Sequence, residues 1–281
     1  MDDTITTIYC LSEEFLQAMG HRDDPQVRLS TAEVMTIPLV AAAFFGGNIE
    51  KARSFLSEYG YMQRMISKSR LNRRLHSIDS WLWEALFSLL AEVFKGRDDT
   101  DATERNYVVD SLPVPVCDNI RIRRCRIYPL EEHGKTFRGY IPSKRRYFYG
   151  LRVHLVVSGS GEPVEFSLAA GSEADVSVFK DLCLDLPEGS SVHADKGYTD
   201  YGHEGFLREL GLRPRIQRKR NSKRPMPMWE EFLGKPVRQY IETVFGELSR
   251  LFSGKKIHAV TPRGFELKIV CFLLAFSIQC L

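Results

Sequence analysis

The chain has 281 residues, of which 43% are hydrophobic and 27% are charged, and its formal net charge is +3 at pH 7. These values are typical of a globular protein with room for two domains, and they exclude a disordered chain. The net charge is too small to indicate a class of partner. The distribution of the charges along the chain is more informative.

Six cysteines occur without a CxxC pair or a dense framework, at positions 10, 117, 125, 183, 271 and 280. This pattern favours free thiols in a reducing compartment, and we expect a cytoplasmic protein. The N-terminus lacks a signal pattern, and the apolar tail 269–281 is too short to span a bilayer, so we expect a buried helix there and no membrane.

Residues 1–98 predict an all-α domain. Helices are expected to begin at Ser12 and at Ser30, where Glu33 completes a capping box, with Pro38 kinking or restarting the second helix. Further helices are expected up to Tyr59, over 62–76, and over the apolar run WLWEALFSLLAEVF (81–94).

The helix over 62–76 is predominantly cationic around a single leucine stripe. Such a helix fits a DNA major groove, in the manner of a helix-turn-helix domain, although a solvated basic face has the same pattern. Its candidate DNA-binding residues are Lys68, Arg70, Arg73 and Arg74.

After a polar segment over 96–105, the pattern changes to strands. Asn106 to Pro115 (NYVVDSLPVP) predicts a buried strand whose regular pairing stops near Ser111, because Pro113 and Pro115 cannot donate to a central ladder. Asp110 would then lie at the exit of the strand. Alone, it fits a turn aspartate bonded to its following backbone as well as a metal ligand.

Four more strands are expected downstream. Residues 147–158 and 163–170 predict a hairpin, a helix follows over 174–184, and shorter strands are expected over 190–195 and 213–217. Asp195 repeats the position of Asp110 at a strand exit, and neighbouring strands would bring the two carboxylates together. We expect His193 to be a satisfied partner or a phosphate neighbour rather than a ligand.

Seven basic residues and no acid lie between Leu212 and Arg224, and we expect a phosphate-contacting loop that includes Arg218, Lys219 and Arg220. A closing helix, VRQYIETVFGELSRLF, has apolar residues at i, i+3, i+4 and i+7 spacing. Glu242 borders that stripe and Arg238 lies on the same flank, so Glu242 is either a third site acid or a surface partner of Arg238.

The motifs DSLPVPV, ADKGY and R-x-x-x-E together resemble the DDE transposases of bacterial insertion sequences, and SKSRLNRRLHSI with VDSLPVPVC resembles the insertion-sequence 982 family. The resemblance implies a ribonuclease H-like catalytic domain over 99–281, with a mixed five-stranded sheet flanked by helices, preceded by a helical DNA-binding domain over 1–98. It also implies that Asp110, Asp195 and Glu242 form the catalytic and metal-binding triad. Related transposases have a tyrosine three residues before the arginine and a lysine seven residues after the glutamate. This chain has Lys235 and Ser249 at those positions, and Arg250 is adjacent to the second.

The implied reaction is hydrolysis at the ends of the element, followed by attack of the freed 3′-hydroxyl on target DNA. Two Mg²⁺ ions about 4 Å apart, with Mn²⁺ able to substitute, would support both steps. Lys196 and Arg238 would neutralise phosphates. The resemblance implies double-stranded DNA as partner (terminal inverted repeats and target), a homodimer in the synaptic complex, a bacterial nucleoid-associated location and no nucleotide cofactor.

Two alternatives remain open at this point. One is a catalytically silent, transposase-derived DNA-binding protein, which the intact acids disfavour. The other is a metal-dependent nuclease without strand transfer, which uses the same metal site.

Overall fold

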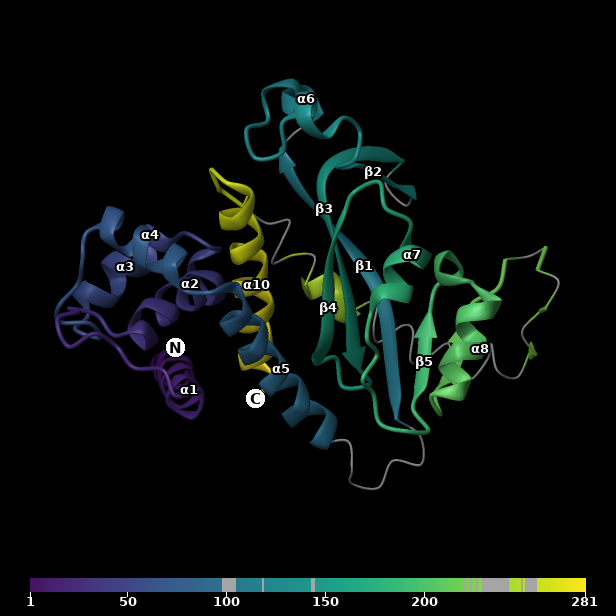
Figure 1. Cartoon of the computed structure of the whole chain (residues 1–281), viewed down its shortest axis with the longest axis horizontal. Coiled ribbons are helices and arrows are strands. Elements are labelled where there is room, and N and C mark those ends of the chain that lie inside the picture. Colours follow the sequence, from purple (N-terminus) through teal and green to yellow (C-terminus); the bar gives the residue numbers. More distant parts are fainter. Residues whose placement is uncertain are drawn as a thin grey trace. The chain divides into compact units, whose positions relative to one another are not determined.

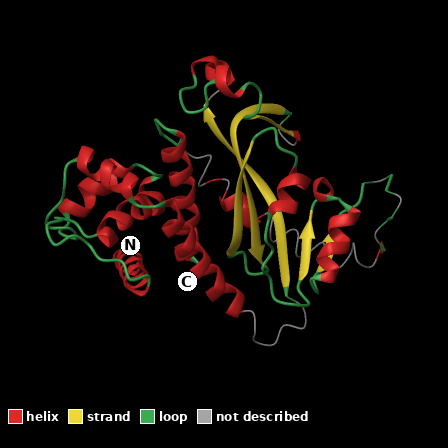
Figure 2. Cartoon of the chain, viewed as in Figure 1, coloured by secondary structure: helices red, strands yellow, loops and turns green. Residues whose placement is uncertain are grey.

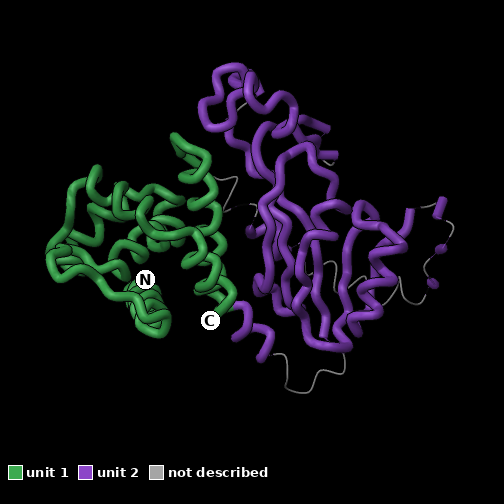
Figure 3. Tube along the Cα trace, in the orientation of Figure 1, with its two compact units in different colours: residues 1–90, 257–281 green, residues 91–256 purple. Residues whose placement is uncertain are grey.

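The structure is a computed structural model that describes residues 1–97, 105–117, 119–142, 145–219, 221–222, 224–225, 227–228, 243–248, 250 and 257–281. The chain forms two compact units, shown in Figure 3. The helical unit comprises residues 1–90 and 257–281, and the sheet unit comprises residues 91–256.

The helical unit confirms the prediction of an all-α N-terminal region, with the helices drawn in red in Figure 2. Its helices are α1 (Asp2–Ala18), α2 (Thr31–Phe45), α3 (Ile49–Glu58), α4 (Lys68–Ser77), the first part of α5 (Ser80–Arg97) and α10 (Pro262–Gln279). The first helix begins ten residues before the predicted start at Ser12, where Asp2 and Asp3 form an acidic first turn.

Helix α2 forms the centre of this unit. The Ser30 side chain accepts a hydrogen bond from the Glu33 backbone, and the Glu33 carboxylate accepts one from the Ser30 backbone, so the predicted capping box is present. The predicted restart at Pro38 is wrong, because α2 runs through this residue. Eleven residues of α2 are buried, and their packing outweighs the roughly 3 kcal/mol that an interior proline costs a helix.

Helix α10 is the buried C-terminal helix that the apolar tail predicts. The expected domain boundary placed it in the catalytic region, whereas it packs with the N-terminal helices. Phe272 lies so close to Gly47 that a Cβ there would come within 2.9 Å of its ring, and the Arg263 guanidinium donates to the Ile78 carbonyl at 3.1 Å. The helical unit is therefore built from two segments that are far apart in the sequence.

The sheet unit contains a mixed six-stranded sheet, shown in Figures 1 and 2. The strands are β1 (Asn106–Cys117), β2 (Arg138–Ile141), β3 (Arg146–Ser158), β4 (Pro163–Ala170), β5 (Ser191–Ala194) and β6 (Arg213–Ile216). Strand order is β2-β3-β1-β5-β6, with β4 also paired to β3. β1 runs antiparallel to β3 and parallel to β5, and β6 is parallel to β5.

The expected five-stranded sheet is one strand short. The additional strand is β2, a segment of sequence RGYI that pairs with the first residues of β3. Its four residues include a glycine and an arginine and lack alternation, so no sequence pattern marks it as a strand.

Strand β1 does not end near Ser111, contrary to the expectation, but continues through both prolines to Cys117. Pro113 pairs with Arg152 and Pro115 with Gly150 in the antiparallel ladder with β3. On the other side of β1, pairing with β5 stops at Val109, so no described strand needs N–H groups from the two prolines. The parallel pairing, rather than the strand, ends at Val109, just before Asp110.

Helices α7 (Asp175–Asp181) and α8 (Tyr201–Glu209) and the short 3-10 helix η3 (Lys196–Tyr198) pack together against the sheet. The Phe179 ring meets the Tyr198 ring edge-on at 5.4 Å and the His203 ring at 4.8 Å. These contacts fix the turn that follows β5.

No single helix in the described ranges is long and apolar enough to cross a bilayer; only α2 and α3 taken together meet that test of length and composition, and they form an angle of 104° at their break.

Candidate functional site

Two of the three predicted site acids directly follow a pair of residues on adjacent parallel strands. Val109 of β1 pairs with Ala194 of β5, and the next residue of each segment is Asp110 and Asp195. Adjacent strands lie roughly 4.8 Å apart, and paired residues point to the same face of a sheet. Asp110 and Asp195 therefore follow the last described pair of this parallel ladder, and the meeting of their carboxylates stays a prediction.

The two acids differ in their surroundings. Asp110 is half-buried, and its Oδ1 accepts a hydrogen bond from the Ser111 backbone at 2.7 Å, as expected of an aspartate bonded to its following backbone. Asp195 is exposed, and its carbonyl accepts from the Tyr198 backbone at 3.0 Å, which starts η3. Lys196 is also exposed, directly beside the acid pair.

The structure describes only some of the remaining residues of the expected site. Glu242 and Arg238 lie outside the described residues, as does Arg220 of the basic loop. Residues 243–248 are helical, with Val244, Phe245 and Leu248 buried, which confirms the predicted apolar face over this stretch. Within the described part of the chain, no three His, Cys, Asp or Glu side chains cluster as metal ligands.

His193 is a satisfied partner, as expected. Its Nε2 lies 2.9 Å from Oδ1 of Asn106, so the ring joins the start of β1 to β5.

Behind the acid pair lies a polar network that the sequence analysis missed. Asp175, at the start of α7, accepts hydrogen bonds from Arg152 at 2.6 Å and from the Ser111 hydroxyl at 3.3 Å. His154 Nδ1 lies 3.2 Å from the Tyr198 hydroxyl, and its Nε2 lies 4.0 Å from Asp175. Ser111 follows Asp110 and Tyr198 closes the turn after Asp195, so one network holds both acid-bearing segments.

The network has strongly shifted titration properties. Burial lowers the pKa of His154 from 6.5 to about 4; Asp175 opposes this shift, and Arg152 adds to it. Burial raises the pKa of Tyr198 well above its ordinary value, with Asp175 and Asp110 adding to the effect. Both side chains are therefore neutral at pH 7, and Arg152 and Asp175 form the charged pair of the network. Strand alternation, which places Arg152 and His154 on one face, was the available sequence signal.

The basic helix α4 divides into exposed and committed side chains. Lys68, Arg70 and Arg73 are exposed. Arg74 is different, because its guanidinium donates to the Leu29 carbonyl at 3.1 Å, to the Thr31 hydroxyl at 3.3 Å and to Asp23 at 3.4 Å. Arg74 thus holds the segment before α2, which sequence alone did not indicate.

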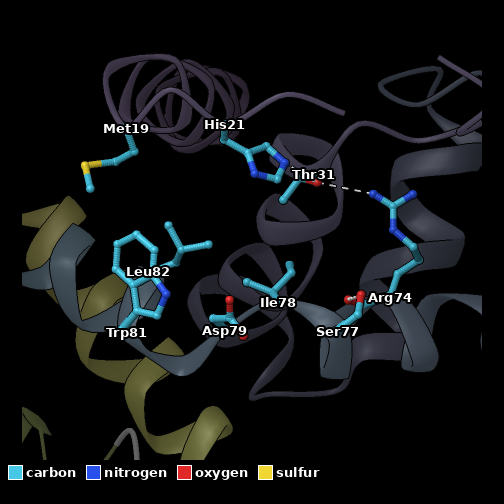
Figure 4. A pocket seen from close by; sticks show the side chains of 9 residues that line it. All are labelled: Met19, His21, Thr31, Arg74, Ser77, Ile78, Asp79, Trp81 and Leu82. Atoms are coloured by element: carbon cyan, nitrogen blue, oxygen red, sulfur yellow. Dashed lines mark hydrogen bonds between the residues drawn. The ribbon is translucent and has the colours of Figure 1, made fainter. Parts of the chain in front are cut away.

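A cavity of about 230 Å³ lies next to this contact, within the helical unit. Figure 4 shows Arg74 and Thr31 joined at one side of it, with His21 beside them and Trp81 and Leu82 on another side. His21 Nε2 lies 3.0 Å from the Thr31 hydroxyl. The cavity is lined by residues of the helical unit alone and does not include the acid pair.

The basic loop after β6 shows the same division. Both terminal nitrogens of Arg218 contact the Glu204 carboxylate at 2.5 Å, and Glu204 is only 1% exposed. The guanidinium also lies over the Tyr201 ring at 5.1 Å. Lys219 is exposed. Arg218 is accordingly tied to α8, and of the two residues of this predicted set that the structure describes, Lys219 is the exposed one.

Carboxylate oxygens are the ligands that hard divalent cations prefer. The family described as the transposase DDE domain matches residues 101–278. The chain belongs to this transposase DDE domain family.

Individual proteins show the same similarity. The transposase for insertion sequence element IS1106 from Neisseria meningitidis serogroup B is 24% identical over 189 residues, which cover 60% of this chain and 65% of that protein. The chain thus spans less than two thirds of the length of this relative. The finer resemblance to the insertion-sequence 982 family stays a prediction.

Two solved structures are similar to the chain at low identity. The piggyBac transposase synaptic complex with hairpin DNA has a TM-score of 0.44 and 11% identity, covering 100% of this chain and 73% of that chain. The Mos1 mariner paired end complex with Mn has a TM-score of 0.26 and 12% identity, covering 92% and 85%. The family assignment rests on the sequence match over residues 101–278.

Proposed function

We propose that the protein is an insertion-sequence DNA transposase that binds terminal inverted repeats, cleaves the element ends and joins the 3′-hydroxyl to target DNA. The observation that supports this proposal is the parallel pairing of Val109 with Ala194, because Asp110 and Asp195 are the residues that follow this pair. Family membership supplies the reaction class, and the sheet supplies a rigid base for the two carboxylates.

The sheet unit is proposed to be ribonuclease H-like. Apart from the short β2, its order is β4-β3-β1-β5-β6, three antiparallel strands followed by two strands parallel to β1. This arrangement supports the expected catalytic domain, while the helical unit is the proposed DNA-binding domain.

The residues present fit divalent metal ions. Hard cations such as Mg²⁺ and Mn²⁺ prefer oxygen ligands, and both acids offer carboxylates at a half-buried or exposed position. Asp110 and Asp195, together with Glu242, would hold two ions. When bound, such ions activate a water or hydroxyl nucleophile and stabilise the leaving 3′-oxygen.

The other side chains would bind and position DNA. Lys196 directly follows Asp195 in the sequence, and its ammonium group would neutralise a phosphate, as would that of Lys219. Arg238, which lies outside the described residues, has the same proposed role. In the helical unit, the exposed Lys68, Arg70 and Arg73 would contact the end sequence. A synaptic homodimer and a nucleoid-associated location in the bacterial cytoplasm complete the proposal.

The two alternatives are a silent DNA-binding relative and a nuclease without strand transfer. The transposase and both alternatives bind DNA, and they differ in whether they cut the element ends and whether they join them to target DNA. A relic binds ends without cutting, and a nuclease cuts without joining.

The test is a strand-transfer assay with Mg²⁺ or Mn²⁺, labelled DNA ends from the element that flanks the gene, and a supercoiled target. We expect joined product from the wild-type protein, and none from Asp110→Asn or Asp195→Asn, each of which should still bind ends. Asp181→Asn is the matched control, because Asp181 is an exposed acid of α7 in the same unit.

End binding without cutting by the wild-type protein would favour the relic. Cutting without joined product would favour the nuclease. Cleavage that persists in Asp195→Asn would contradict the assignment of the second acid.

A further inference from the structure

The segment between β1 and β3 forms a small lobe at the end of the sheet beyond Asp110, where Figure 1 shows α6 and β2. We call residues 119–142 the basic lobe. It contains the 3-10 helix η1 (Asn119–Arg124), α6 (Leu130–His133) and β2. No residue of this lobe belongs to the proposed metal site or to the predicted DNA-binding set.

The basic lobe has its own aromatic core. The Tyr128 and Phe137 rings stack at 3.8 Å with an interplanar angle of 15°, and the His133 ring meets Phe137 edge-on at 5.2 Å. The Tyr149 hydroxyl of β3 donates to the Tyr128 carbonyl at 3.0 Å, and the Asn119 amide donates to the Tyr147 carbonyl at 2.7 Å. The lobe is therefore fixed to β3, and its surface is built in advance of any partner.

That surface is strongly cationic at η1. Arg121, Arg123 and Arg124 of η1 are exposed, as is Arg126 just after it. Across the part of the chain that the structure describes, none of these four forms an ion pair with a carboxylate, in contrast to Arg74, which pairs with Asp23. The two acids of α6, Glu131 and Glu132, belong to a separate helix of the lobe.

One apolar side chain stands among these arginines. Ile120 is 92% exposed, the highest exposure among the large hydrophobic residues of the described chain. An apolar side chain bordered by guanidiniums suits a DNA groove, where apolar atoms meet sugar and base edges while arginines reach the flanking phosphates.

The position of the basic lobe sets its distance from the acid pair. Asp110 and Cys117 are seven residue steps apart along β1, and at about 3.3 Å per step this distance is about 23 Å. At 3.4 Å per base pair, this length corresponds to about seven base pairs of duplex.

We propose that the basic lobe is a DNA-binding surface, whose η1 arginines contact the phosphates of duplex DNA about seven base pairs from the cleaved position. This inference rests on the proposed function, since it places the scissile phosphate at Asp110 and Asp195. Arginines that are exposed and lack a carboxylate partner contact a polyanion without first breaking an internal ion pair, and a prebuilt surface loses little conformational entropy on binding.

The experiment measures binding and footprints on a duplex element end, with all variants made in the Asp110→Asn background so that cleavage plays no part. The test variant replaces Arg121, Arg123 and Arg124 with Gln. We expect at least a tenfold loss of affinity at about 0.1 M salt, and a salt dependence of log K that is shallower by about 2 to 3, because each lost phosphate contact removes about 0.9. Protection of phosphates about seven base pairs from the cut should disappear.

Two controls accompany the test. Replacement of the same three arginines with Lys keeps the charge, so binding and salt dependence should stay close to those of the parent. Replacement of Glu131 and Glu132 with Gln alters charge in the same lobe without removing a cation, and its affinity should equal or exceed that of the parent.

Unchanged affinity, salt dependence and footprint in the Gln variant would overturn the proposal. So would a Gln variant that binds DNA normally but changes oligomeric state, since the surface would then contact protein. Failure of the wild-type protein to cut DNA would count against the proposed function instead, because the role of the basic lobe is measured by DNA affinity and footprint alone.

Discussion

Arg74 shows how a side chain in a basic run can have a structural role. Its guanidinium contacts Leu29, Thr31 and Asp23, whereas the neighbouring Arg73 is exposed. The sequence predicted both as DNA contacts because charge and helical position are local properties. The partners of Arg74 lie more than forty residues away and depend on the tertiary fold.

We predict that Arg74→Ala lowers the free energy of unfolding of the helical unit by about 1–3 kcal/mol, because it removes charge-assisted hydrogen bonds and leaves Asp23 without its guanidinium partner. Thermal unfolding followed by circular dichroism measures this. Arg73→Ala is the control, and it should leave stability within about 0.5 kcal/mol while weakening DNA binding. Equal stability of the two variants would contradict the structural role of Arg74.

His154 makes stability depend on pH. The ordinary pKa of a histidine is 6.5, and burial lowers the pKa of His154 in the folded protein to about 4. As the pH falls from about 6.5 to about 4, the unfolded chain binds a proton that the folded protein does not, so the free energy of unfolding decreases, by a few kcal/mol at most.

We therefore predict that His154→Gln flattens this part of the pH dependence. Urea unfolding at pH 7.5, 6 and 5 gives the stability of both proteins. The difference between wild type and variant should shrink as the pH falls, because only the wild type has this penalty. A constant difference across the three pH values would show that His154 does not titrate as its burial indicates.

At the scale of elements, local patterns predicted most of the fold. The hairpin of β3 and β4, the short strands β5 and β6, and helices α2, α3 and α5 agree with capping residues, alternation and turns in the sequence. Helix α4 begins at Lys68, six residues after its predicted start at Met62. The misses in the sheet have a common cause. β1 continues through two prolines, and β2 forms from RGYI, because the neighbouring strand β3 determines which segments can pair.

The pairing of β1 with β3 depends on a close backbone approach at Gly150. A Cβ at this position would lie 2.3 Å from the Val114 carbonyl oxygen and 2.7 Å from the Val116 nitrogen. We predict that Gly150→Ala destabilises the sheet unit by about 1–3 kcal/mol or more, as overpacking does in a well-packed interior. Chemical denaturation measures the change.

Gly205→Ala is the matched control for this substitution. Gly205 lies inside α8, and a Cβ there meets nothing within 4 Å, so alanine should stabilise the helix by about 0.5–1 kcal/mol. A Gly150→Ala protein as stable as wild type would mean that β1 and β3 are less closely packed at this point than the structure shows.

At the scale of the whole molecule, the position of α10 could not be predicted from its place in the sequence. The apolar tail predicted a buried helix correctly, but no local pattern states which helices bury it. The structure places it with α2 in the helical unit, so that unit is formed by both ends of the chain.

We predict that Phe272→Ala destabilises the helical unit selectively. Phe272 is 3% exposed, and removal of a buried phenylalanine side chain costs about 3–5 kcal/mol. Hydrogen exchange should accelerate at amides of α2 and α10 and stay unchanged in β1 and β3. Phe148→Ala, at 2% exposure in β3, should give the reverse pattern. Acceleration in the sheet unit by Phe272→Ala would contradict the division of the chain.

We propose that the sheet brings Asp110 and Asp195 to one divalent cation. Iron-mediated cleavage tests it most directly, because Fe²⁺ bound in place of Mg²⁺ reduces added hydrogen peroxide to hydroxide and hydroxyl radical, is itself oxidised to Fe³⁺, and the radical cuts the nearby backbone. The account predicts peptide fragments that end close to residue 110 and close to residue 195, both suppressed by excess Mg²⁺ and both absent in Asp110→Asn. Cleavage at only one of the two segments, or cleavage at 195 that persists in Asp110→Asn, would contradict a shared site.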